Sequence, residues 1–257
     1  MVNAYQAPTV KKAFQILKSV SKSRQGMGIS ELSKQLFLGK STVFGILNAL
    51  ENVGAVVRDP TTKTYTLGVT LFELGRAAYS RIDIKEIARP AMEALMERVQ
   101  ESVFLGVRNK EHLTILDIVE SMQDLKITAP VGSRIPLFAG AAGKVFMASM
   151  PEEQAAELIR MKGIPRFTKH TIINPMRFME EIRKARRTGY ATDDEEYIPG
   201  VRAVAAAIQG TRTLSAAIWV VGFKPRIDAK KMAFLAEETL YSAREISEKI
   251  KTADAAR

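Results

Sequence analysis

The stretch from Gly28 to Leu67 limits the possible folds of this chain more than any other part of the sequence. Ser30 is a favourable N-cap for a short helix ending near Leu36, and residues 37–39 favour a tight turn because they include a glycine. A second helix is predicted from Lys40 to Asn52. Its apolar residues recur at i, i+3, i+4 and i+7 and therefore form one stripe, which consists of Val43, Ile46, Leu47 and Leu50.

Two short β-rich segments follow this helix pair. Ala55–Arg58 and Thr64–Leu67 flank residues 59–63, which contain the turn-forming sequence Asp-Pro-Thr-Thr. A hairpin placed directly after two short helices is the wing of a winged helix-turn-helix, an arrangement that reads duplex DNA. We therefore predict a DNA-binding domain of this type over residues 1–67.

The predicted DNA contacts lie on the outer face of the second helix and on the hairpin. A helix N-terminus that carries a lysine and two hydroxyls can donate to phosphate oxygens, and the next turn can meet base edges in the major groove. Asn48 matches the donor and acceptor pattern of adenine. Phe44 suits a buried position as well as an exposed one, and Lys40 and Lys63 could equally be solvated surface charges. The candidate set is Lys40, Ser41, Thr42, Phe44, Asn48, Arg58 and Lys63.

The charge distribution supports a phosphate-rich partner. Residues 1–80 contain ten lysines and arginines against four acids, a net charge of +6 out of +10 for all 257 residues. Such a concentration favours salt-sensitive DNA binding. The chain has no cysteine, which excludes disulfides and thiolate metal sites, and we find no signal peptide and no apolar run long enough to span a bilayer. These features favour the cytoplasm and argue against a membrane partner.

The remainder of the chain predicts a linker and a second domain. A helix over residues 8–21 is expected to pack behind the reading helices through an apolar side that includes Val10 and Phe14, and an amphipathic helix over 68–81 is taken as the linker. The second domain covers residues 82–257. Its β-rich runs lie at 103–107, 113–119, 125–129, 203–209 and 215–222, and its helical runs include 141–149, 152–161, 174–188 and 228–251. Strands in runs bordered by helices indicate the α+β class with an antiparallel sheet.

No pattern in the sequence supports catalysis or metal binding. The segment GAAGKV at 140–145 is similar to a phosphate loop, but Phe138 and Val145 occupy the positions that need the first glycine and the hydroxyl residue. There is no Gly-x-Ser-x-Gly motif, and His112 and His170 lie far apart in sequence. The acidic run at 193–196 lacks the spacing of a calcium loop. We therefore expect no catalytic residue, no metal and no cofactor.

Three segments resemble the IclR family of transcriptional regulators. They read ISELSKQLFLGKSTVFGILNALENVGAVVRD in the first domain, and VGSRIPLFAGAAGKVFMAS and RRTGYATDDEEYIPGVRAVAAAI in the second. The resemblance covers almost the whole chain and implies a C-terminal domain with a GAF-like fold that binds a small effector. It also implies a homodimer, often paired into a tetramer, on a partly palindromic operator. Gly45 stands where the family often has an arginine, and Phe138 stands where a polar residue is frequent.

The resemblance also places the effector against the sheet of the second domain, covered by the segment at 193–203 and by the loop and helix at 138–146. Small residues there let a ligand approach amides near a helix N-terminus, which favours an anion. The acidic run could instead be a solvated turn, and the single tryptophan could be a core residue. Apolar residues at positions where relatives can place polar groups favour an aromatic or otherwise hydrophobic effector. The candidate effector-binding residues are Gly140, Ala141, Asp193, Ala203, Trp219 and Val221.

These patterns predict a DNA-binding regulator whose operator affinity responds to a small organic effector. Two other classes stay open at this point. An architectural DNA-binding protein would have the same first domain but would show no thermal shift with any ligand. A small-molecule enzyme would use the second domain, and its active-site spacing should then be visible in the sequence.

Overall fold

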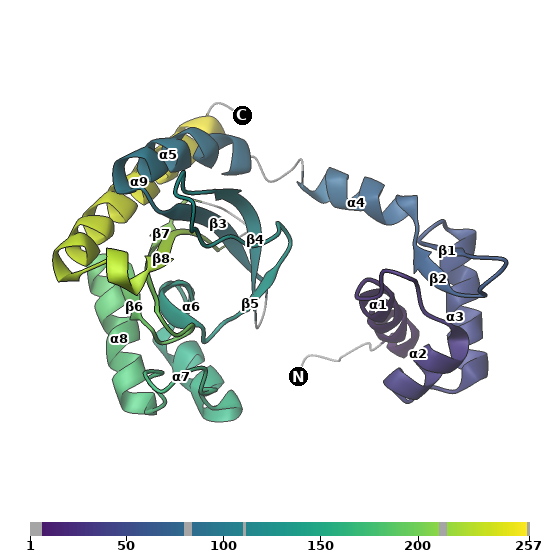
Figure 1. Ribbon diagram of the computed structural model, residues 1–257. Coiled ribbons are helices and arrows are strands. Elements are labelled where there is room, and N and C mark those ends of the chain that lie inside the picture. The colour runs from purple at the N-terminus through teal and green to yellow at the C-terminus, as the bar shows by residue number, and fades with distance from the viewer. Residues whose placement is uncertain (1–6, 80–83, 110–111, 211–214, 256–257) are drawn as a thin grey trace. The chain divides into compact units, whose positions relative to one another are not determined.

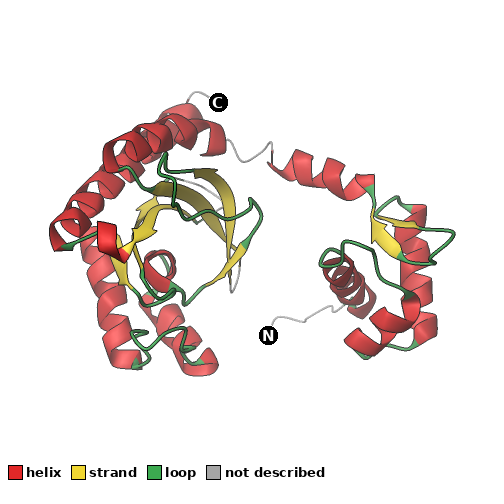
Figure 2. Cartoon of the chain, viewed as in Figure 1, coloured by secondary structure: helices red, strands yellow, loops and turns green. Residues whose placement is uncertain are grey.

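The computed structural model describes residues 7–79, 84–109, 112–210 and 215–255. The chain divides into two compact units, Met1–Ile82 and Asp83–Arg257, and each is described by itself. Figure 1 labels the helices and strands of both units. Figure 2 shows that the first unit is mostly helical, whereas the second builds a curled sheet with helices around it.

The first unit is a helix pair with a supporting helix before it and a hairpin after it. The hairpin strands pair antiparallel, with Val56 opposite Leu67. This order of elements is the expected winged helix-turn-helix. Its elements are α1 (Pro8–Val20), α2 (Ile29–Leu36), α3 (Lys40–Asn52), β1 (Val56–Arg58), β2 (Tyr65–Leu67) and α4 (Val69–Tyr79).

One small core holds the helices and the hairpin of this unit together. Ile16 of α1 and Leu47 of α3 are fully buried, and Tyr65 of β2 closes the same cluster. The expectation that Val10 and Phe14 also pack behind the reading helices is wrong, because these side chains are 55% and 59% exposed. Helix α1 is apolar on two sides, and only one of them faces the core.

The connection between α2 and α3 differs from the expected turn. Ser30 does not cap α2, which begins at Ile29 after an extended Gly28. The residue in the left-handed conformation is Phe37, with φ 54°, whereas Gly39 is extended and is the N-cap of α3. A side chain on a residue in the left-handed conformation costs about 1 kcal/mol, so the turn forms despite the conformational preference of Phe37.

The second unit contains a six-stranded antiparallel sheet in the order β5-β4-β3-β8-β7-β6. Its strands are β3 (Ser102–Asn109), β4 (His112–Val119), β5 (Arg134–Pro136), β6 (Tyr190–Asp194), β7 (Val201–Ile208) and β8 (Ala216–Phe223). Its helices are α5 (Ile84–Val99), α6 (Gly140–Ala148), α7 (Glu152–Lys162), α8 (Pro175–Thr188), the 3-10 turn η1 (Lys224–Arg226) and α9 (Ala229–Ala255).

The helices cover the two faces of this sheet differently. Helix α6 lies in the hollow of the curled sheet and contacts β6, β7 and β8, while α7 and α8 pack beside it (Figure 1). Helices α5 and α9 contact each other and cover the outer face (Figure 2). The main core of the unit therefore lies between α6 and the inner face of the sheet, where Phe104, Phe146 and Trp219 are buried.

One predicted strand of this unit is wrong, and the observed strand β6 was not predicted. Residues 125–129 form no strand; Leu125 is exposed, and the strand that follows β4 is Arg134–Pro136. Strand β6 was not expected, because its sequence is polar and ends in the acidic run. It forms because β7 supplies a continuous antiparallel partner, from Ala206 opposite Tyr190 to Arg202 opposite Asp194. A long-range partner thus decides the structure of a segment whose local sequence is ambiguous.

Candidate functional site

The outer face of α3 is open to solvent over its whole length. Lys40, Ser41, Thr42 and Asn48 are exposed, and the side chain of Phe44 is 54% exposed, which settles its position on the outside. The opposite face is anchored by a buried stripe that packs against α1 and α2 and consists of Val43, Ile46 and Leu47. The helix therefore presents its polar and aromatic side chains outward from a fixed base.

The hairpin presents the two remaining candidates for DNA contact. Arg58 and Lys63 are exposed, and the guanidinium of Arg58 lies 5.9 Å from the ring centre of Tyr65. The turn between them is held by Asp59, whose carboxylate accepts hydrogen bonds from the amides of Thr61 and Thr62 at 2.7 and 2.9 Å. The Thr62 and Thr61 amides lower the pKa of Asp59. The basic groups are thus carried on an ordered turn.

All six effector-binding candidates line one cavity in the second unit. Its volume is about 220 Å³, and it lies between the inner face of the sheet and the N-terminal end of α6. For comparison, a cavity of roughly 150 Å³ holds benzene. We call it the ligand cavity; its walls include Phe104, Ile115, Ile127, Ala129, Ile135, Gly140, Ala141, Asp193, Tyr197, Ala203, Trp219 and Val221.

Strand register explains why residues distant in sequence meet there. Asp193 lies opposite Ala203, and Ala203 lies opposite Val221, so these three form a row across β6, β7 and β8. Trp219 lies two residues from Val221 on β8 and opposite Phe104 on β3. Because side chains two residues apart share a face of a strand, both rows point into the hollow that holds α6.

Trp219 and Phe104 form the aromatic part of the cavity wall. Their rings stack with centres 5.6 Å apart and planes 7° apart. Gly106 makes this possible, since a Cβ atom there would lie 2.6 Å from the Trp219 ring and 2.8 Å from the carbonyl oxygen of Thr114. Trp219 is only 4% exposed, so it belongs to the core as well as to the cavity. Sequence reasoning missed Phe104, although it lies within a predicted strand.

Asp193 is the acidic group of the ligand cavity. It is 5% exposed, and its Oδ1 accepts a hydrogen bond from the Glu196 amide at 2.6 Å. Its Oδ2 lies against Gly140, where a Cβ atom would approach it to 2.0 Å, and Gly140 has a φ of 54°. Burial raises the pKa of Asp193 to about 7. The acidic run therefore begins inside the cavity wall, not in a solvated turn.

Lys144 ties this acidic segment to α6. Its side chain is 1% exposed, and its Nζ donates to the Thr192 carbonyl at 2.9 Å and to Glu196 Oε1 at 2.5 Å. Burial raises the pKa of Glu196, while Lys144 acts in the opposite direction. In the sequence, Lys144 is part of a segment similar to a phosphate loop, and no local signal indicates its structural role. The contact holds the strand that carries Asp193 against the helix that carries Gly140.

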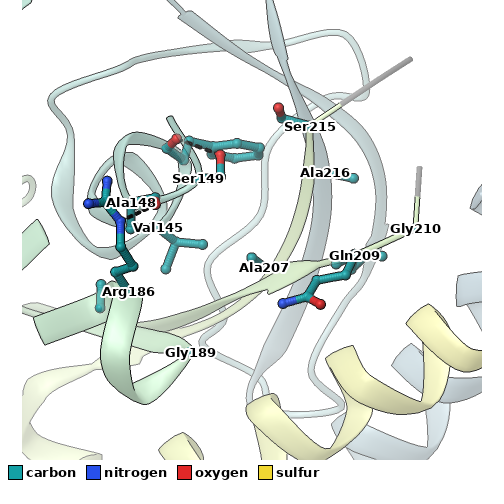
Figure 3. A pocket seen from close by; sticks show the side chains of 13 residues that line it. Val145, Ala148, Ser149, Arg186, Gly189, Ala207, Gln209, Gly210, Ser215 and Ala216 are labelled. Atoms are coloured by element: carbon teal, nitrogen blue, oxygen red, sulfur yellow. Dashed lines mark hydrogen bonds between the residues drawn. The ribbon is translucent and has the colours of Figure 1, made fainter. Parts of the chain in front are cut away.

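A second cavity, of about 510 Å³, lies at the other end of α6 (Figure 3). Figure 3 shows Arg186 beside the C-terminal end of α6, where its Nε donates to the Ala148 carbonyl at 3.1 Å. None of the effector-binding candidates lines it. Gly210 and Ser215 line this cavity and flank residues 211–214. Residues 211–214 lie outside the described residues, and we propose no ligand for this cavity.

Two kinds of feature are absent from the described ranges. None of the helices there is both long and apolar enough to cross a membrane. Across those same ranges, no three His, Cys, Asp or Glu side chains are grouped closely enough to hold a metal ion.

Comparison with known proteins covers nearly the whole chain. Residues 9–60 match the IclR helix-turn-helix domain, and residues 76–248 match the C-terminal domain described as "Bacterial transcriptional regulator IclR C-terminal". The HTH-type transcriptional repressor AllR of Escherichia coli K12 is 29% identical over 242 residues, which span 94% of this chain and 89% of that protein.

Solved structures agree with these matches. The crystal structure of Thermotoga maritima IclR superposes with a TM-score of 0.69 at 28% identity, over 95% of this chain and 98% of that one. An IclR homologue from Microbacterium hydrocarbonoxydans, complexed with 4-hydroxybenzoate, has the same fold, with a TM-score of 0.77 at 19% identity over 95% and 99% of the two chains. The two family matches together span both units, and the chain therefore belongs to the IclR family of bacterial DNA-binding transcriptional regulators.

Proposed function

We propose that this regulator binds operator DNA through α3 and the hairpin, and that a small organic effector in the ligand cavity changes that affinity. The observation that supports the first part is the open face of α3 above a buried stripe. Lys40, Ser41 and Thr42 would donate to phosphate oxygens near the helix N-terminus, while Phe44 and Asn48 would meet base edges. Two exposed cations on the hairpin, Arg58 and Lys63, would contact the flanking backbone.

The convergence of six candidates on one cavity supports the second part. The cavity is large enough for one substituted aromatic ring, and the stacked pair of Trp219 and Phe104 offers such a ring an apolar wall. Asp193 supplies a hydrogen-bonding group beside the first amides of α6. We therefore infer an aromatic or otherwise hydrophobic effector that carries a polar substituent. The relative crystallised with 4-hydroxybenzoate is consistent with this class.

We also infer a homodimer, with a tetramer as the next assembly. One α3 reaches too few base pairs to define a unique site, and two-fold symmetry doubles the contacts. The first unit has apolar surface that is unused within the described residues: Val10 and Phe14 on α1, and Val69, Phe72 and Leu74 on α4, are each more than half exposed. Exposed apolar side chains on the first and last helices of a small domain favour burial against a second copy.

The alternatives predict different behaviour. An architectural protein would bind DNA without responding to any ligand, and an enzyme would consume its ligand. The described residues that line the ligand cavity include no histidine, cysteine or lysine, which favours reversible binding over catalysis by an activated nucleophile. A regulator of this kind would act in the cytoplasm, where bacterial DNA lies.

The proposal is tested by selecting DNA sites from a random library with the full chain. The double variant Lys40→Ala, Asn48→Ala should bind the selected site roughly 100-fold more weakly, because it loses one phosphate contact and one base contact. Fluorescence anisotropy at fixed salt measures the Kd, and circular dichroism checks that the variant is folded. Unchanged affinity would refute the assignment of α3.

The effector class is tested by thermal shift with 4-hydroxybenzoate, glyoxylate and pyruvate. We expect stabilisation by the aromatic acid and none by the two small acids, since only the aromatic ring fills the apolar part of the cavity. Tight binding of glyoxylate or pyruvate without binding of the aromatic acid would contradict the inference.

A further inference from the structure

The base-reading side of α3 has an unusual composition for a DNA-binding helix. Four exposed residues follow the i, i+3, i+4, i+7 spacing and so share one side of the helix, opposite the buried stripe. We call this side the reading face. It consists of Ser41, Phe44, Gly45 and Asn48.

The reading face carries no cation. The sequence of α3 contains a single basic residue, Lys40, which is the first residue of the helix and precedes the reading face. In the major groove, guanine is read mainly by arginine or lysine, which donate to its O6 and N7 atoms. The reading face therefore lacks the groups that select a G·C pair.

Two of its side chains match an A·T pair instead. The amide of Asn48 can donate to N7 and accept from N6 of adenine in a bidentate contact. Phe44 is an apolar side chain, 54% exposed among polar neighbours, and the thymine methyl group is the apolar feature of the major groove. The two residues are four apart, which separates them by roughly 6 Å along the helix, or about two base-pair steps.

Gly45 leaves open space on the reading face beside these two side chains. A Cβ atom built there would have no neighbouring atom within 4 Å. The backbone of α3 can therefore approach the floor of the groove closely at this position, and no longer side chain holds Phe44 and Asn48 away from the bases.

We propose that α3 selects A·T base pairs at the centre of each operator half-site, with Asn48 reading an adenine and Phe44 contacting the methyl group of a thymine within two or three base pairs of it. This inference rests on the proposed function, and it adds which base pairs the helix prefers.

The experiment uses the full chain and the DNA site obtained by selection. At the central A·T pairs, thymine is replaced one position at a time by deoxyuridine, which lacks only the methyl group. Adenine is replaced by 7-deazaadenine, which lacks only the N7 acceptor. We expect a loss of roughly fourfold for the methyl group and about tenfold for the N7 acceptor, because the Asn48 amide then loses one of its two hydrogen bonds. Each effect should disappear in its matching variant, Phe44→Ala for deoxyuridine and Asn48→Ala for 7-deazaadenine.

Two further variants separate base reading from general binding. Lys40→Ala should weaken binding to all of these DNAs equally and lower the salt dependence, because it removes a phosphate contact. Gly45→Arg places a guanidinium on the reading face in open space, and sites selected with it should gain a guanine. G·C pairs at the centre of the wild-type half-sites, or insensitivity to deoxyuridine at every central position, would overturn the inference while leaving DNA binding intact. Failure to select any DNA would instead refute the proposed function.

Discussion

Replacing Lys144 by methionine tests the contact that holds the ligand cavity together. The change keeps most of the side-chain volume but removes the ammonium that donates to Thr192 and Glu196. Leaving one partner of a buried ion pair alone costs about 3–5 kcal/mol. The Glu196 side chain is 13% exposed and can take up a proton, so we expect the lower end, about 3 kcal/mol. In a domain of this size, that corresponds to a fall in Tm of roughly 6–12 °C.

The pH dependence of this loss follows from Glu196. Burial raises its pKa in the folded state, and removing Lys144 raises that pKa further. A carboxyl group whose pKa is higher in the folded than in the unfolded state stabilises the fold at low pH. This stabilisation is lost as the pH rises through the folded-state pKa. The difference in Tm between wild type and Lys144→Met should therefore be larger at pH 8 than at pH 5. The double variant Lys144→Met, Glu196→Gln should recover part of the loss at pH 8, because a neutral amide replaces the Glu196 carboxylate that lost its partner.

The fluorescence of Trp219 provides the assay, since this is the only tryptophan of the chain and reports on the second unit alone. Lys251→Met is the matched control: that lysine is 54% exposed and pairs with Glu248 on the surface of α9, so its loss should change stability by less than about 1 kcal/mol. Equal stability of wild type and Lys144→Met at pH 8, or a double variant weaker than the single one, would refute the reasoning.

Three further changes have defined outcomes. Gly106→Ala should destabilise the second unit by about 1–3 kcal/mol in urea unfolding followed by Trp219 fluorescence, because the new methyl group meets the Trp219 ring at 2.6 Å; a neutral change would mean that the ring can move aside. Asp193→Asn should stabilise the unit increasingly between pH 5 and pH 8, since burial raises the pKa of Asp193 to about 7 and its ionised form opposes folding; a stability difference independent of pH would contradict this. Phe37→Gly should stabilise the first unit by about 1 kcal/mol in circular dichroism melts, because φ at this exposed residue is 54°; a lower Tm would show that the phenyl ring makes a stabilising contact.

The helix pair and the hairpin could be predicted because their signals are local. The buried stripe of α3 repeats with the helical period, and the hairpin is set by a short connection, residues 59–64, whose sequence favours a turn. The ligand cavity could be predicted only through the family resemblance, which supplied Gly140, Asp193 and Trp219. Periodicity alone would have given these residues no common location, since they lie on three different elements.

The amino-acid sequence by itself determined which segments are helices of the DNA-binding unit and which side of α3 is apolar. It also determined that the opposite side of α3 carries no arginine. Those properties depend on neighbours within a few residues. Only the tertiary structure decided that Asp193, Ala203 and Val221 form one row, that Phe104 stacks on Trp219, and that Lys144 is buried against a residue 52 positions away. The physical reason is that strand pairing and burial depend on partners distant in the chain, which also made β6 a strand despite its polar sequence and left Phe14 exposed despite its apolar side chain.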